Sequence, residues 1–205
     1  YMGATVLHED AIFPVRNAGI PINIRNTNQP NDRGTMIVAS ASGYDSEHVI
    51  TGVAGRKGFS VITIEKDMMN AEVGFGRKVL EIFEENDISF EHLPSGIDTM
   101  SVILASSVLE GRRERILQTL NRRLRPDSIV IEDGLALVAV VGRGMVKAKG
   151  TAVRVFNALA DAHINIRMID QGSSELNIIV GIEEHDYENA VRAIYHAFVK
   201  ESSKK

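Results

Sequence analysis

Two glycines at the start of an amphipathic segment are well placed to bind a small anion. The stretch EVGFGRKVLEIFEEND puts Gly74 and Gly76 directly before a helical apolar pattern. The first turn of a helix has backbone N–H groups without intrahelical partners and a partial positive charge, and both favour a carboxylate. Glycine lets a ligand approach the backbone closely. The same glycines could instead serve only to form the turn before the helix, and the residue types leave both interpretations open.

The stretch that follows, ISFEHLPSGID, could supply the second half of an amino-acid site. A carboxylate such as Glu91 suits a ligand ammonium group, although it could also be a solvated residue at a strand edge. We predict that His92 is a surface imidazole rather than a metal ligand, because no cluster of metal-ligating residues surrounds it. The loop from Ser95 to Asp98 could close over a ligand. Phe75, between the two glycines, is expected to be exposed there.

Composition limits the function classes. The 205 residues are 44% hydrophobic and 24% charged, as in ordinary globular proteins. A net charge of −4 argues against a nucleic-acid partner, and the longest apolar runs are too short to span a membrane. The absence of cysteine excludes disulfides and thiol chemistry. We expect a cytoplasmic protein, and a piece of a longer chain because the first residue is Tyr1.

Hydrophobic periodicity predicts alternating strands and helices after residue 45. The segment 1–45 differs: it reads as a short helix and two short strands, too few to bury a core, and resembles the end of something larger. The remaining expected strands are 48–55, 59–67, 88–93, 99–106, 128–134, 135–142, 163–170 and 176–182. The remaining expected helices are 74–87, 109–123, 150–162 and 185–200.

An internal repeat determines the predicted fold. Without any gap, Gly74 aligns with Gly150 and Val79 with Val155, and such self-similarity indicates a repeated structural unit. Each unit reads strand, helix, strand, strand, helix. One more strand would complete a ferredoxin-like βαββαβ unit, in which helices cover one face of an antiparallel sheet. We therefore predict an α+β fold with two such units.

Strand accounting predicts that the first unit is inserted in the second. The first unit has a final strand at 128–133, the second has none, and the strand at 48–55 is spare. If the strand at 48–55 completes the second unit, it covers a sheet edge of that unit that would otherwise be exposed. The alternative is that 48–55 pairs with the segment 1–45. The predicted domains are 58–133 and the combination of 46–57 with 134–200, after a separate segment 1–45.

Several motifs resemble those of aspartate kinases. YMGATVLH, NAGIPINIRNT and GTMI are similar to the last stretch of the amino-acid kinase domain, so 1–45 is expected to be its tail and linker. VITGVAGRKGFSVITIE, VGFGRKVLEIFEENDIS and PSGID resemble the regulatory half of that family. VAVVGRGM, ALADAHINIRMIDQGSSELNI and YENAVRAIYHAF resemble its second ACT domain, a module that senses small molecules in amino-acid metabolism. The single-function bacterial type fits best.

The resemblance implies a regulatory fragment of an enzyme. The family transfers phosphate from ATP to L-aspartate, giving 4-phospho-L-aspartate on the path to lysine, threonine and methionine. Its nucleotide loop would lie upstream of residue 1, and no phosphate-binding loop is present in this sequence. We expect no catalytic residue, metal site or cofactor in this fragment. ATP and Mg would belong to the parent kinase, and the fragment alone is predicted to be inactive.

The resemblance also implies an effector site between the ACT domains of a homodimer. Lysine is the expected effector, and threonine stays open because Ser95 is followed by glycine where some lysine-sensing relatives have glutamate. The kinase domain of the parent chain would be the other partner. The effector-binding positions carried over from the family are Met69, Gly74, Phe75, Gly76, Phe90, Glu91, His92, Ser95, Asp98, Asn165 and Ile166.

Two other functions compete with this interpretation. The chain could be a separate regulatory subunit that senses threonine or another amino acid without kinase activity. A DNA-linked amino-acid sensor would need a helix-turn-helix and a basic face. The arginine-rich stretch 112–125 is more simply a solvated helix face. The sequence does not settle the effector, dimer against tetramer, or which ACT domains pair.

Overall fold

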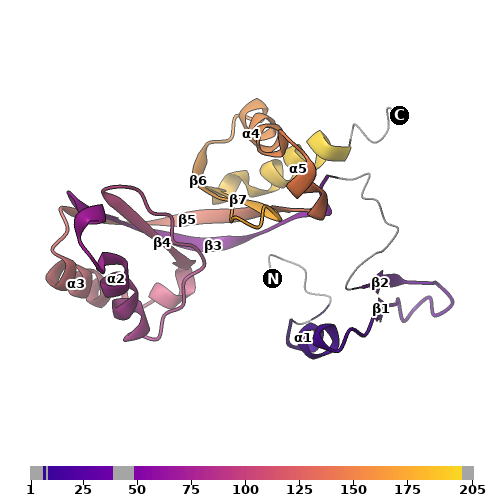
Figure 1. Cartoon of the computed structure of the whole chain (residues 1–205), viewed down its shortest axis with the longest axis horizontal. Helices are drawn as coiled ribbons and strands as arrows, with labels where there is room; N and C mark the ends of the chain where they lie inside the picture. The colour runs from indigo at the N-terminus through magenta and orange to yellow at the C-terminus, as the bar shows by residue number, and fades with distance from the viewer. Residues whose placement is uncertain (1–6, 8, 39–48, 200–205) are drawn as a thin grey trace. The chain divides into compact units, whose positions relative to one another are not determined.

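The computed structural model describes residue 7, residues 9–38 and residues 49–199, which form two units, 1–47 and 48–205 (Figure 1). In the first unit, helix α1 (Glu9–Asn17) precedes a small antiparallel pair of strands. These strands, β1 (Ile22–Ile24) and β2 (Thr35–Ile37), pair from Ile22 with Ile37 to Ile24 with Thr35. This agrees with the short helix and short strands that the sequence predicts there.

The second unit is built on two long antiparallel strands, β3 (Gly52–Glu65) and β5 (Ser128–Val141). They lie within a five-stranded antiparallel sheet of order β4-β3-β5-β7-β6. The other strands are β4 (Thr99–Ala105), β6 (Ile166–Asp170) and β7 (Asn177–Glu183). The helices are α2 (Phe75–Glu84), α3 (Arg113–Leu124), α4 (Thr151–Asp161) and α5 (Tyr187–Val199). Short 3₁₀ helices occupy Met69–Ala71, Ser106–Leu109, Arg143–Lys147 and Glu184–Asp186.

Each long strand serves both repeats. The first part of β3, from Gly52 to Arg56, pairs with the last part of β5, whereas the second part of β3 pairs with β4 and with the first part of β5. The early strand therefore joins the sheet beside the second repeat, as the strand accounting predicts. The sequence prediction was wrong in dividing each long strand in two, because a bulge lets the chain continue without leaving the sheet.

The bulge lies in the middle of the long strands and is held by polar contacts. The register of β3 against β5 shifts on both sides of Phe59, and Gly134 opposite has a φ of 77°. The hydroxyl of Ser60 donates a hydrogen bond to Asp133 Oδ1 at 2.6 Å. Arg113 also binds Asp133 and lowers the pKa of its carboxyl, with a smaller contribution from Ser60. These contacts fix the connection between the two repeats.

Two separate hydrophobic cores lie under the two helix pairs. The first is formed by α2 and α3 with the neighbouring parts of β3, β4 and β5, and the second by α4 and α5 with β5 and β7. Figure 1 shows α2 with α3 at one end of the sheet and α4 with α5 at the other. The apolar stripe that predicted the helix at 74–87 is the buried face of α2, including Val79, Ile82 and Phe83.

Two sequence predictions need correction. The stretch 88–93 is not a regular strand: it makes isolated bridges, His92 with Ile103 and, beyond it, Ser95 with Met100. Pro94 between these bridges has no N–H to donate, which interrupts the ladder. Phe75 is buried in the first core with 4% of its surface exposed, because α2 begins at this residue and turns it inward.

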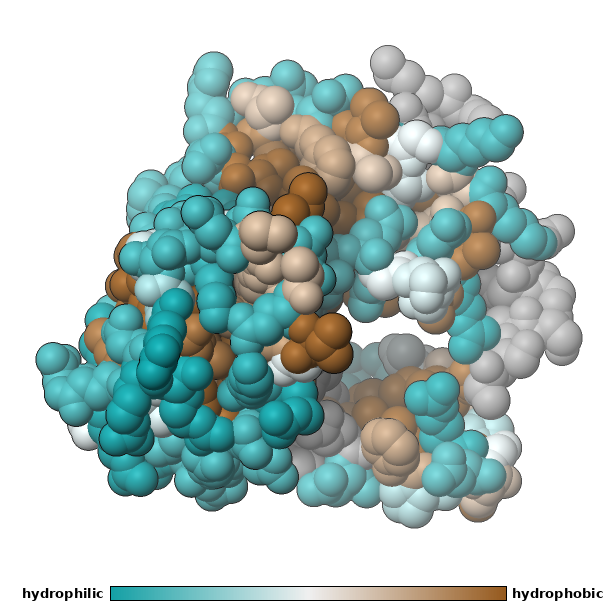
Figure 2. All heavy atoms as spheres, turned by 60° about the vertical axis from the view of Figure 1, so that its left-hand side comes forward, coloured by the Kyte–Doolittle hydropathy of each residue, from teal (hydrophilic) through white to brown (hydrophobic). Residues whose placement is uncertain are grey.

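Figure 2 shows a mainly hydrophilic face on the side carrying α2 and α3, with hydrophobic side chains in separate patches. Within residues 7, 9–38 and 49–199, none of the helices has the length and apolar character needed to cross a membrane.

Candidate functional site

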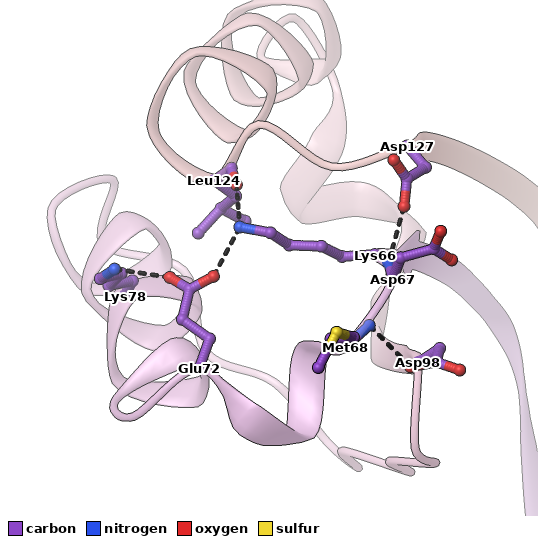
Figure 3. Close-up of polar contacts among 8 residues, drawn as sticks. All are labelled: Lys66, Asp67, Met68, Glu72, Lys78, Asp98, Leu124 and Asp127. Carbon is purple, nitrogen blue, oxygen red and sulfur yellow. Dashed lines mark hydrogen bonds and ion pairs between the residues drawn. The ribbon is translucent and has the colours of Figure 1, made fainter.

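The loop after β3 is joined by hydrogen bonds to the loop before β4. The backbone N–H of Lys66 donates to the carbonyl of Asp98 at 2.9 Å. The N–H of Met68 donates to Asp98 Oδ1 at 3.0 Å (Figure 3). The N–H of Asn70 donates to the carbonyl of Ile97 at 3.1 Å. The structure thus brings together the two segments in which the sequence predicted Met69, Gly74, Ser95 and Asp98. Asp98 itself holds the first loop in place.

The start of α2 has an open left-handed turn. Gly74 is the N-cap with a φ of 82°, and a Cβ at this position would meet nothing within 4 Å. Gly76 lies in the first turn, where N–H groups have no intrahelical partner. No acidic side chain lies in that turn. The turn at Gly74 is thus unobstructed, and carboxylate binding at these two glycines stays a prediction.

A carboxylate between two lysines braces this loop. Glu72 accepts a hydrogen bond from Lys66 Nζ at 2.5 Å and one from Lys78 Nζ at 2.6 Å (Figure 3). These hydrogen bonds, that of Lys66 first, lower the pKa of Glu72. Lys66 Nζ also donates to the carbonyl of Leu124 at the end of α3, at 2.8 Å. The same Nζ lies 5.5 Å from the ring centroid of Phe75.

Apolar side chains are exposed around the helix start. Met68 is 71% exposed and has a φ of 58°, an uncommon conformation for a residue other than glycine. Val73 is 97% exposed and Ile97 is 68% exposed. Single exposed apolar side chains are ordinary, but several around one loop are typical of a surface that binds something. Met69, by contrast, is buried in the first core.

The predicted residues 90–92 lie along a different edge. Phe90 is 42% exposed, and Glu91 lies 3.9 Å from Arg56. His92 Nδ1 lies 2.8 Å from Asp170 Oδ2 at the end of β6. His92 therefore connects its segment to β6, and among the described residues no group of three or more metal-ligating side chains is present.

The two predicted residues of the second repeat have different surroundings. Asn165 is exposed, directly before β6. Ile166 is half-buried, pairs with Ile182 and packs against the second core. The predicted positions therefore fall into one group at the start of α2 and another along the edge where residues 90–92 approach β6.

Sequence reasoning missed the residues that brace the site. Lys66 and Lys78 each lie six positions from Glu72, a spacing that could have drawn attention to a charge network. Its third member, the carbonyl of Leu124, lies 58 positions from Lys66 and carries no sequence signal. Arg167 was also missed; it binds Glu132 at 2.8 Å and Glu183, each from another strand.

Comparison with known proteins connects this fold to aspartokinases. A family model described as an ACT domain matches residues 138–198. Aspartokinase 3 of Bacillus subtilis (strain 168) is 40% identical over 199 residues, which cover 97% of this chain and 43% of that relative. The crystal structure of Clostridium acetobutylicum aspartate kinase, described as an allosteric enzyme, is 54% identical with a TM-score of 0.91, covering 97% of this chain and 46% of that one.

Two structures of E. coli aspartokinase III have the same fold. The complex with aspartate and ADP (R-state) is 25% identical with a TM-score of 0.77, over 97% of this chain and 43% of that one. The complex with lysine and aspartate (T-state) is 23% identical with a TM-score of 0.72, over 95% and 42%. The chain spans less than half the length of all these relatives.

The two kinds of comparison agree with the topology. The family model covers the second repeat, whereas the relatives align with nearly the whole chain. Residues 138–198 therefore match the ACT domain family model, and nearly the whole chain is similar to a part of the aspartokinases that is less than half of their length.

Proposed function

We propose that this chain is the feedback-regulatory region of an aspartate kinase and that lysine, an end product, binds at the start of α2. The parent enzyme would use ATP and Mg to phosphorylate L-aspartate to 4-phospho-L-aspartate, and the chain by itself would be inactive. The similarity to the Bacillus and Clostridium enzymes supports the parent activity. The observation that supports the site best is the pair of hydrogen-bonded loops beside the open helix start.

The ligand groups would be divided between the two loops. The carboxylate would bind N–H groups of the first turn of α2 near Gly76, aided by the helix dipole and the nearby Lys78 ammonium. The N–H of Phe75 is already bonded to the carbonyl of Glu72. An ammonium group would bind Asp98 or, across a dimer, Glu91. The exposed side chains of Met68 and Val73 would then contact the ligand or a second copy of the chain.

Regulation would follow from different affinities of the ligand for two arrangements of the enzyme. The two ACT domains, 58–133 and 46–57 with 134–200, would pair between the chains of a homodimer and act on the kinase domain. A ligand shifts such an equilibrium only by its difference in affinity for the two states. A coupling free energy of about 1–3 kcal/mol is typical of such systems.

One observation favours a second candidate, a regulatory subunit or region that senses threonine or another amino acid. Asp98 Oδ1 already accepts the N–H of Met68 at 3.0 Å, so this carboxylate is partly occupied by the loop itself. A ligand with an uncharged side chain would not need a second ammonium partner.

Calorimetric titration of the dimeric chain with lysine, threonine and methionine tests the proposal. We expect lysine to bind, and Asp98→Ala or Glu91→Ala to weaken binding about tenfold or more, as the loss of a charge-assisted hydrogen bond does. Asp161→Asn, at the far end of α4, is the control. Binding of threonine alone would support the second candidate, and no binding of any of the three to a folded dimer would reject amino-acid sensing.

A further inference from the structure

A small cavity lies on the sheet, away from the start of α2. It has a volume of about 150 Å³. Its floor includes two pairs of facing residues on neighbouring strands, Val61 with Ile103 and Thr63 with Ser101. Pro94 lines it from the segment before β4, and Met168 from β6. Both repeats therefore contribute to its walls.

The cavity exists because the two edges of the sheet approach each other. His92 and Asp170, on segments at opposite edges, lie 2.8 Å apart. Leu137 and Ala139 of β5 belong to neither helix-covered core, yet they are 0% and 1% exposed. The chain thus covers this part of the face, whereas Glu132 and Ile169 beside the cavity are exposed.

The polar groups of the cavity match those of an amino acid. Arg167 uses two of its five N–H donors on Glu132 and Glu183, and Glu132 also lines the cavity. Among the described residues, the hydroxyls of Thr63 and Ser101 make no hydrogen bond, although they lie side by side on the floor. The remaining lining is mainly apolar. A guanidinium, a carboxylate and two hydroxyls therefore converge on an otherwise apolar space.

We propose that this cavity is a second amino-acid site, which binds a small α-amino acid with an apolar side chain. The ligand carboxylate binds the remaining donors of Arg167, and the ammonium binds Glu132 and one of the two hydroxyls. The side chain lies against the apolar wall near Ile103. A cavity of about 150 Å³ holds a molecule of benzene, which is larger than the side chain of a small amino acid such as valine. The much longer lysine side chain, with a terminal charge, does not match this lining.

A ligand at this site would contact both repeats and hold the two edges of the sheet together. Thr63 and Ser101 belong to the first repeat and Arg167 to the second, so a bound amino acid stabilises the approach of the two edges. This site uses none of the residues at the start of α2, and it does not depend on lysine binding there.

Titration of the full 205-residue chain with L-valine, L-leucine and L-methionine, followed by calorimetry, tests the proposal. We expect at least one of these ligands to bind once per chain, with a Kd of about 0.1–1 mM for a ligand of this size. The D-enantiomers should not bind. Thr63→Val and Ser101→Ala preserve shape while removing the hydroxyls, and together they should weaken binding about tenfold. Arg167→Gln should abolish it.

Controls separate this site from the proposed lysine site. Thr119→Val, which removes a hydroxyl from the outside of α3, should leave binding unchanged. Asp98→Ala should weaken lysine binding and leave valine binding intact. If the three apolar ligands do not bind the wild-type chain, or bind equally well to the folded Thr63→Val, Ser101→Ala variant, the second site is rejected whatever lysine does.

Discussion

Replacement of Phe75 by alanine distinguishes a core residue from an exposed ligand contact. The side chain is 4% exposed and packs in the first core, beside Val79 and under the ammonium of Lys66. Truncation of a buried phenylalanine costs about 3–5 kcal/mol. Phe75 lies at the first turn of α2, where the chain can partly fill the space left by the removed ring. We therefore expect the free energy of unfolding to fall by an amount near the lower limit, about 3 kcal/mol.

Urea unfolding followed by circular dichroism measures this loss. With a slope of about 2 kcal/mol/M, the unfolding midpoint of Phe75→Ala should fall by about 1.5 M. Phe90→Ala is the matched control because Phe90, predicted for the same site, is 42% exposed. Its midpoint should change by no more than about 0.3 M.

Equal midpoints for the two variants would refute the assignment of Phe75 to the core. A second variant, Phe75→Leu, retains most of the buried apolar surface and should lose less than about 1.5 kcal/mol. If the Leu variant folded normally but bound no lysine, the ring itself would be the ligand contact, and the burial argument would fail.

Three further changes probe the surroundings of the site and the sheet. Glu72→Gln should lower the stability of the fold at neutral pH and remove part of the loss of stability in acid. The pKa of Glu72 is held below its ordinary value of 4.5. The carboxylate therefore contributes fully to stability above that value, and this contribution is lost as the pH falls through the lowered pKa. Urea unfolding at a series of pH values measures this. Gly134→Ala should cost about 1–2 kcal/mol in thermal unfolding because its φ is 77°, whereas Gly52→Ala, without a positive φ, should cost much less. Tyr187→Phe should cost about 0.5–1.5 kcal/mol by removing the hydrogen bond to the carbonyl of Gly55, and an unchanged melting temperature would contradict that contact.

The repeat made most of the topology predictable. Gly74 and Gly150 were aligned from the sequence, and both prove to be left-handed N-caps, with φ values of 82° and 83°. The strand left over at 48–55 predicted that one repeat interrupts the other, because every strand edge needs a partner. These conclusions depend on local patterns that recur at equivalent positions, which is the kind of information that a single sequence contains.

The site was less predictable because its contacts are not local. The apolar pattern of 88–93 is that of a strand, but bridging there is limited by Pro94 and by the turn toward β6. The spacing of Phe75 between two glycines says nothing about the direction of its side chain. The contact of Lys66 with Leu124 depends on how the two helices of the first repeat end beside each other.

The contacts between the two repeats differ greatly in strength, and this indicates where the five-stranded sheet can rearrange. At the centre of the sheet, β3 and β5 are continuous, and Ser60 and Arg113 both bind Asp133 at the bulge. At the edges of the sheet, His92 contacts Asp170, whose side chain is 44% exposed. An exposed pair of this kind contributes about 1 kcal/mol or less to stability. We therefore expect an effector to alter the approach of the edges rather than the long strands. A ligand that binds beside this contact needs only a small difference in affinity between the joined and the separated edges to shift the equilibrium between them.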